Sequence, residues 1–222
     1  MNAEYIKNIL FTKINEVAET INNYSVNPQK DFTRNRKLTA EKLIKGIIGM
    51  GSANLTNEIL DMFDLSSSAP TPSAFVQQRC KLKPEAFETI FKSFTSEITK
   101  EAVDSIPILA VDGSDVHIAT NPDDAETYYA GNNGQKGYNL IHLNALYDIN
   151  RHLYTDILIQ NSRKGNEHKA FTEMIDRLEL SKAIILADRG YESYNNIAHI
   201  QEKGLNFLFR IKDANGGIKQ GL

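Results

Sequence analysis

The sequence predicts an α/β protein in which a helical region precedes a mixed β-sheet. Up to about residue 100, apolar residues such as Ile6, Leu10 and Ile14 recur at the three- or four-residue spacing of amphipathic helices. From about residue 105, the pattern changes to the short apolar or alternating runs that are typical of strands. A chain of 222 residues has room for two small domains, and we divide it into 1–100 and 101–222.

Five helices are expected in the first region. Thr39 is a favourable N-cap residue for the second helix. Pro72 suits the first position of the fourth helix, because its missing N–H would have no partner there in any case. The expected helices span 1–20, 40–50, 55–63, 72–82 and 83–101.

The second region is expected to form three antiparallel strands followed by two βα units. Residues 148–151 are a plausible tight connection between the second and third strands, which would form a hairpin. Each of the last two strands follows a helix, so we expect it to join the sheet parallel to its neighbouring strand. The strands are expected at 106–118, 138–150, 152–162, 182–188 and 206–212, and the helices at 166–180 and 193–204.

Composition excludes several classes of protein. The single Cys80 rules out an internal disulfide and a cysteine-based zinc site, which fits a reducing cytoplasm. No apolar stretch approaches the ~20 residues of a transmembrane helix, and the N-terminus lacks a signal-peptide cleavage site. We therefore expect a cytoplasmic protein without a membrane partner. Because the net charge is −3, any binding to nucleic acid would depend on local basic patches.

Two strand candidates each consist of an apolar run that is followed by an aspartate. "PILAVDG" leads to Asp112 and "AIILADRG" leads to Asp188. Such runs suit central strands that are covered on both faces, and functional groups gather at the carboxyl ends of parallel strands. Two adjacent carboxylates disfavour each other's ionisation, and a divalent cation removes this repulsion. Oxygen ligands favour Mg²⁺ or Mn²⁺, which could activate water or a 3′-hydroxyl for attack on a phosphodiester.

Basic residues are expected around this pair. The third strand should end at the same edge as Asp112, so its following loop would bring Arg163 and Lys164 there. Lys136 and Arg189 would complete a ring of cations suited to a phosphate backbone. The loop after the first strand also carries two acids, at 123 and 124, which weaken this argument.

Four motifs together resemble the DDE transposases of bacterial insertion sequences, in particular the fourth insertion-sequence family. They read "AVDGSD", "KGYNLIHLNALYD", "NEHKAF" and "LADRGYES", in that order. The resemblance implies an RNase H-like catalytic core in which Asp112 and Asp188 are the first two catalytic, metal-binding acids. It also implies strand cleavage and transfer at insertion-sequence ends, two Mg²⁺ (or Mn²⁺) ions in the complete enzyme, double-stranded DNA as partner, a homodimer on paired ends, and a location at the bacterial nucleoid.

The third acid of that family is a glutamate on a late helix, and no matching motif occurs in this sequence. The sequence reaches "KDANGGIKQGL" directly after the fifth strand. We therefore expect an N-terminal portion of a transposase that is inactive by itself.

The first region offers candidate DNA contacts. The helices between Thr39 and Leu82 allow a helix-turn-helix-like arrangement, and a basic run precedes them. The alternatives are the polar face of a small bundle and an ordinary solvated charge run. The candidate residues are Arg34, Arg36, Lys37, Gln77, Gln78, Arg79 and Lys81.

Other functions remain open from sequence alone. Asp112 before Gly113 could be a simple turn signal. The chain could be a non-catalytic DNA-binding remnant of a transposase, or an unrelated metal-dependent nuclease or phosphatase. Asp115 would lie on the strand face opposite to Asp112. The five histidines show no paired spacing, so none is assigned to metal, although His142 could approach the site.

Overall fold

The computed structural model describes residues 2–34, 36–100, 105–132, 134–211 and 218, apart from the side chain of Lys164. The chain divides into two compact units, Met1–Glu101 and Ala102–Leu222. Each unit has its own hydrophobic core, and we describe each by itself.

The first unit is helical, as the periodicity predicts. Its two longest helices, α1 and α5, pack against each other, and Phe75, Leu43 and Ile44 are fully buried in the core. Thr39 caps α2 by accepting a hydrogen bond from the backbone of Lys42 at 3.2 Å. The helices are α1 (Ala3–Glu19), α2 (Ala40–Gly49), α3 (Leu55–Met62), α4 (Pro72–Arg79) and α5 (Glu85–Thr99), with a 3-10 turn η1 (Ile21–Tyr24).

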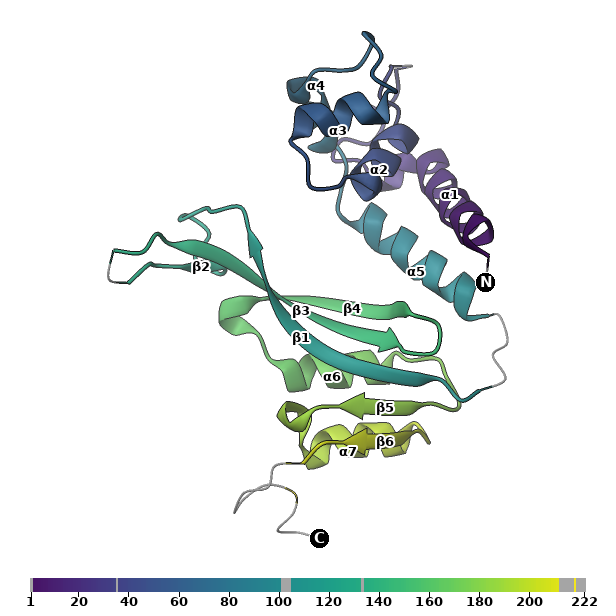
Figure 1. The fold of residues 1–222 in the computed structure, drawn as a ribbon, viewed down its shortest axis with the longest axis vertical. Coiled ribbons are helices and arrows are strands. Elements are labelled where there is room, and N and C mark those ends of the chain that lie inside the picture. The colour runs from purple at the N-terminus through teal and green to yellow at the C-terminus, as the bar shows by residue number, and fades with distance from the viewer. Residues whose placement is uncertain (1, 35, 101–104, 133, 212–217, 219–222) are drawn as a thin grey trace. The chain divides into compact units, whose positions relative to one another are not determined.

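The second unit is built on one mixed sheet (Figure 1). Strand β1 (Ile108–Ile118) pairs antiparallel with β3 (Tyr138–Asp148), which pairs antiparallel with β4 (Leu153–Asn161). On its other edge β1 pairs in parallel with β5 (Ile184–Ala187), and β5 pairs in parallel with β6 (Asn206–Phe209).

Two helices connect the parallel strands, α6 (Glu167–Asp176) before β5 and α7 (Tyr194–Glu202) before β6. This order confirms the predicted fold class, which is a mixed sheet of three antiparallel strands followed by βα units. The sequence did not predict β2 (Tyr128–Tyr129), a two-residue strand that pairs with the start of β3. Lys212, the last residue of the predicted fifth strand, lies outside the described residues.

The predicted hairpin between β3 and β4 is confirmed, and a buried aspartate holds it together. The Oδ1 atom of Asp148 accepts hydrogen bonds from the backbone of Asn150 and Arg151, at 2.9 and 3.0 Å. Its Oδ2 atom pairs with the Arg151 guanidinium at 2.7 Å. A turn that satisfies its own buried charge fixes the register of both strands.

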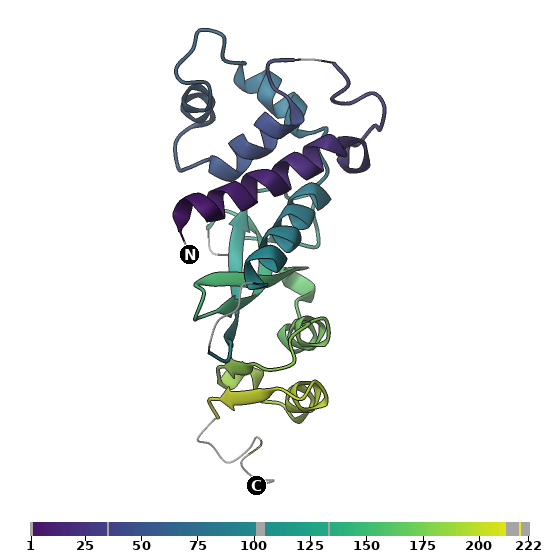
Figure 2. The same ribbon diagram turned by 90° about the vertical axis from the view of Figure 1, so that its right-hand side faces the viewer.

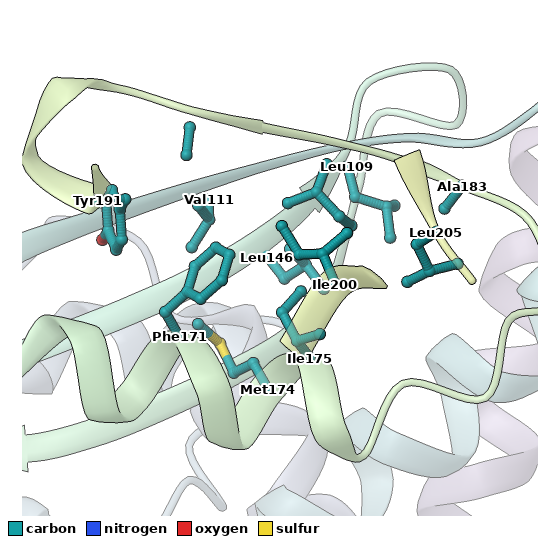
Figure 3. Packing of buried hydrophobic residues seen from close by; sticks show 12 residues of the cluster. Leu109, Val111, Leu146, Phe171, Met174, Ile175, Ala183, Tyr191, Ile200 and Leu205 are labelled. Carbon is teal, nitrogen blue, oxygen red and sulfur yellow. The ribbon is translucent and has the colours of Figure 1, made fainter. Parts of the chain in front are cut away.

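Helices α6 and α7 both pack on one face of the sheet (Figure 2). That face carries Leu109, Val111 and Leu146, which are buried together with Phe171 of α6 and other core residues (Figure 3). The opposite face stays partly exposed, and we call it the open face. Along both β1 and β5, buried residues alternate with partly exposed ones.

This alternation differs from the expectation that β1 and β5 are covered on both faces. Leu208 of β6, on the open face, is 66% exposed. On β3, Ile141 and Leu143 also lie on the open side and are half-buried. The apolar runs arise because the open-face residues are apolar as well.

No helix in the described parts of the chain is long and apolar enough to cross a membrane.

Candidate active site

Strand register brings Asp112 and Asp188 to adjacent positions. The parallel pairing of β1 and β5 aligns Ala110 with Leu186. Two residues further along each strand come Asp112 and Asp188, so both project on the open face. Neighbouring strands lie about 4.8 Å apart, so the two carboxylates fall within reach of one shared ion.

The two aspartates differ in their place along their strands, and Asp112 lies inside β1, in agreement with the strand expected at 106–118. Strand β5 stops at Ala187, but β1 continues past Asp112 to Ile118, paired with β3 alone. Asp112 therefore lies where β1 loses its parallel neighbour. The candidate site is the carboxyl edge of the parallel half of the sheet, which agrees with the usual place of ligand sites in such sheets.

Both carboxylates are exposed, and a neighbouring backbone N–H orients each of them. Asp112 Oδ1 accepts a hydrogen bond from Gly113 N at 2.9 Å. Asp188 Oδ1 accepts one from Gly190 N at 2.7 Å and so caps the short turn η3 (Arg189–Tyr191). Asp188 thus has a local structural role, which leaves its Oδ2 atom available to a ligand.

These two carboxylates fit a magnesium-type ion. Mg²⁺ is commonly held by one or two protein carboxylates, with waters and substrate phosphates completing its coordination. Among the described side chains, no group of three or more His, Cys, Asp or Glu residues is arranged to hold a metal ion. The pair therefore offers two protein ligands, and the remaining positions would fall to water and phosphate oxygens.

Behind Asp112, on the helix-covered face, lies a polar cluster of Asp115, His142 and Glu167. His142 Nδ1 lies 2.9 Å from Asp115 Oδ1, and its Nε2 lies 3.2 Å from Glu167 Oε1. Asp115 projects opposite to Asp112, as alternation along β1 requires. The sequence did not indicate this cluster, because its members come from β1, β3 and α6. The pairing of Asp115 with His142 in the strand register was the only signal that could have found it.

Tyr191 lies near all these acids. Its side chain is buried, and its hydroxyl has no hydrogen-bond partner within the described part of the chain. Burial raises the pKa of the Tyr191 phenol well above its ordinary value, and the carboxylates of Glu167, Asp112 and Asp188 raise it further. The phenol therefore stays protonated and keeps a hydrogen to donate.

The predicted ring of cations is only partly assembled. Arg189 is exposed directly after Asp188. Arg163 instead donates a hydrogen bond to the Tyr128 carbonyl at 2.9 Å and lies over the Tyr129 ring, 5.5 Å from its centre. Strand β2 pairs at the level of Ile118, six residues along β1 from Asp112. At about 3.3 Å per residue, this separation is roughly 20 Å.

The two remaining cations that were expected in the ring are Lys136 and Lys164. Lys136 is exposed in the connection between β2 and β3. The side chain of Lys164, which was also predicted to join the ring, lies outside the described residues. Arg189 thus adjoins Asp188 in the chain, whereas Arg163 lies with Tyr128 and Tyr129, away from the carboxylates.

In the first unit, some of the candidate DNA contacts share one cavity of about 1010 Å³. Its lining includes Arg34, Arg36, Gln78 and Lys81, together with Lys30. Two acids, at 19 and 41, also line it. The cavity therefore carries a net positive charge.

The other candidates of this unit are placed differently. Lys37 donates a hydrogen bond to the Ser68 carbonyl at 3.3 Å, while Gln77 and Arg79 are exposed. Gln78 is buried at 7% exposure and accepts a hydrogen bond from Lys81. Gln78 is therefore not on the exposed surface that carries Gln77 and Arg79.

Fold and site together describe a mixed α/β unit with paired carboxylates at the edge of its parallel strands. The family described as Transposase DDE domain matches residues 104–220, more than half of the chain. The chain belongs to this family of DDE-domain transposases. Its members use divalent metal ions, and the RNase H-like fold class implied by the sequence motifs agrees with the observed topology.

A comparison with solved structures finds a piggyBac transposase in a synaptic complex with hairpin DNA. It is 13% identical in sequence, with a TM-score of 0.49 over 93% of this chain. The chain spans about half of that protein, 49% of its length. No curated protein sequence matches the chain.

Proposed function

We propose that this chain acts as a DNA transposase, with metal-dependent strand cleavage and transfer at the ends of an insertion sequence. Asp112 and Asp188 would be its catalytic, metal-binding acids. The observation that carries the proposal is their placement in register on one open, solvent-accessible face, combined with membership of the family. We assign no third acid.

In this proposal the two carboxylates hold Mg²⁺ or Mn²⁺ through their free oxygens. A bound divalent cation supplies an activated water and stabilises charge on a phosphodiester. The chain's own contribution is orientation, because each carboxylate is held by a backbone N–H at 2.9 or 2.7 Å. The exposed Arg189 would pair with a phosphate oxygen of the substrate.

The first unit would bind the phosphate backbone of double-stranded DNA. Arg34, Arg36 and Lys81 line one cavity, and such clustered cations bind DNA largely by releasing its counterions. The exposed residues Gln77 and Arg79 are proposed as further contacts. Lys37, Lys136, Arg163 and Lys164 remain in the proposal as sequence-based candidates only. We extend the proposal to insertion-sequence ends and target DNA as partners, a homodimer on paired ends, and a bacterial nucleoid location.

A calorimetric Mn²⁺ titration of the wild type and Asp188→Asn tests the metal site. Asparagine keeps the side-chain oxygen that caps η3, so the fold should persist while the charge is lost. Asp123→Asn is the control, because Asp123 is an exposed loop acid of the same unit.

We expect measurable binding by the wild type and Asp123→Asn, and much weaker binding by Asp188→Asn. Identical weak binding in all three proteins would reject the assignment. Cleavage of arbitrary DNA by the chain, lost in Asp112→Ala, would instead favour an unrelated nuclease.

A further inference from the structure

The imidazole of His142 packs against the backbone of Gly113, the residue after Asp112. A Cβ added at Gly113 would lie 2.7 Å from His142 Nε2 and 3.0 Å from Glu167 Oε1. Real Cβ atoms essentially never approach a neighbour closer than 3.0 Å. The His142 ring therefore lies directly against Gly113, and only a residue without a side chain fits between the ring and the strand.

Two carboxylates from different elements hold that ring. Asp115 of β1 lies 2.9 Å from Nδ1, and Glu167, the first residue of α6, lies 3.2 Å from Nε2. The His142 side chain is 13% exposed, so solvent screens these contacts only in part. Through His142, the first half of β3 is in contact with both β1 and the start of α6.

The contact between His142 Nε2 and Glu167 Oε1 is close, but it is not a well-directed hydrogen bond. The Nε2 atom is buried and, among the described residues, lacks a hydrogen-bond partner of good geometry. The better-directed contact is the one to Asp115. We therefore expect the ring's position to depend first on Asp115 and second on Glu167.

A direct path leads from this ring to the candidate metal ligand. The Gly113 N–H donates the 2.9 Å hydrogen bond that orients the Asp112 carboxylate. The direction of this N–H depends on the peptide plane at Gly113, against which His142 packs. A shift of the ring would thus rotate the donor that aims Asp112.

We propose that His142 is a positioning residue for Asp112, acting through the Gly113 backbone and itself held by Asp115 and Glu167. This proposal rests on the proposed metal-binding role of Asp112. His142 and the proposed ion lie on opposite faces of β1, so His142 orients the site without contacting the ion. In metal proteins, loss of a residue that orients a ligand typically weakens metal binding about 10- to 100-fold.

The test compares two variants of His142 with a matched histidine elsewhere in the same unit. His142→Phe keeps an aromatic ring without hydrogen-bonding atoms, and His142→Gln restores an amide donor. His199→Phe is the control, because His199 also pairs with an aspartate, Asp176, at 2.6 Å. Free Mn²⁺ is measured by electron paramagnetic resonance for each protein, and melting temperatures are recorded in parallel.

We expect His142→Phe to bind Mn²⁺ about tenfold more weakly, His142→Gln to recover most of the affinity, and His199→Phe to match the wild type. Unchanged affinity in His142→Phe, or an equal loss in His199→Phe, would overturn the positioning role. So would a His142→Gln variant that binds no better than His142→Phe. If the wild type itself binds no better than Asp188→Asn, the proposed metal site fails and this proposal fails with it.

Discussion

Replacing Gly113 with alanine tests the close packing beside Asp112. The new Cβ would lie 2.7 Å from His142 Nε2, so the ring must retreat by about 0.7 Å to reach the 3.4 Å of an ordinary contact. Overpacking of this kind costs about 1–3 kcal/mol. Glu167 ends in a flexible side chain that can turn aside, whereas the His142 ring is held by two carboxylates. The stiffer unfolded chain returns about 0.4–1 kcal/mol. We expect a net loss of roughly 1 kcal/mol in the free energy of unfolding.

This loss is measured by unfolding the protein in urea and following the transition of the second unit. A double-mutant cycle isolates its cause. In the His142→Ala background, Gly113→Ala should become nearly neutral or stabilising, because the obstructing ring is gone. Gly49→Ala is a control of opposite sign, followed in the transition of the first unit: Gly49 ends α2 and has nothing within 4 Å of an added Cβ, so a gain of about 0.5 kcal/mol is expected. An equal effect of Gly113→Ala in both backgrounds would refute the packing argument.

Three further predictions concern other parts of the chain. Asp148→Ala should lower the free energy of unfolding by about 3–5 kcal/mol in urea titrations, because the Arg151 guanidinium, only 8% exposed, loses the Asp148 carboxylate. The pKa of Tyr191 is higher in the folded than in the unfolded chain, so the free energy of unfolding should fall as the pH rises above ~10. Between pH 9 and pH 11, this fall should be smaller in Tyr191→Phe than in the wild type. Arg34→Ala should reduce the slope of log affinity against log salt by about 0.9 in DNA-binding anisotropy, whereas an unchanged slope would remove Arg34 from the interface.

The sequence was sufficient to predict the order of strands and the pairing of the two aspartates. The two aspartates were expected to lie close together if their strands are parallel neighbours, and the parallel pairing of β1 with β5 meets this condition. The short 148–151 connection requires a hairpin. These are local signals, and they determine the topology because few arrangements satisfy them together.

Other features depend on distances that periodicity does not measure. Arg163 lies with Tyr128 and Tyr129 because β1 continues six residues beyond Asp112, which carries the following loops away from the carboxylates. The one-sided cover of the sheet escaped prediction because the open-face residues are as apolar as the core.

The cluster around His142 was invisible for a related reason. Its three members are far apart in sequence and meet only once the β1–β3 register and the start of α6 are known. A lone histidine on a strand gives no sign of the two carboxylates that hold it. Contacts of this kind have to be read from the folded structure.

Asp112 and Asp188 are proposed to form one cation site at the edge of the parallel strands. Crystals soaked in Mn²⁺ would reveal such a site through the anomalous scattering of the metal. We expect a peak in contact with carboxylate oxygens of both residues, at about the 2.1 Å typical of Mg²⁺-type coordination. A peak bound elsewhere, with neither aspartate as a ligand, would contradict it.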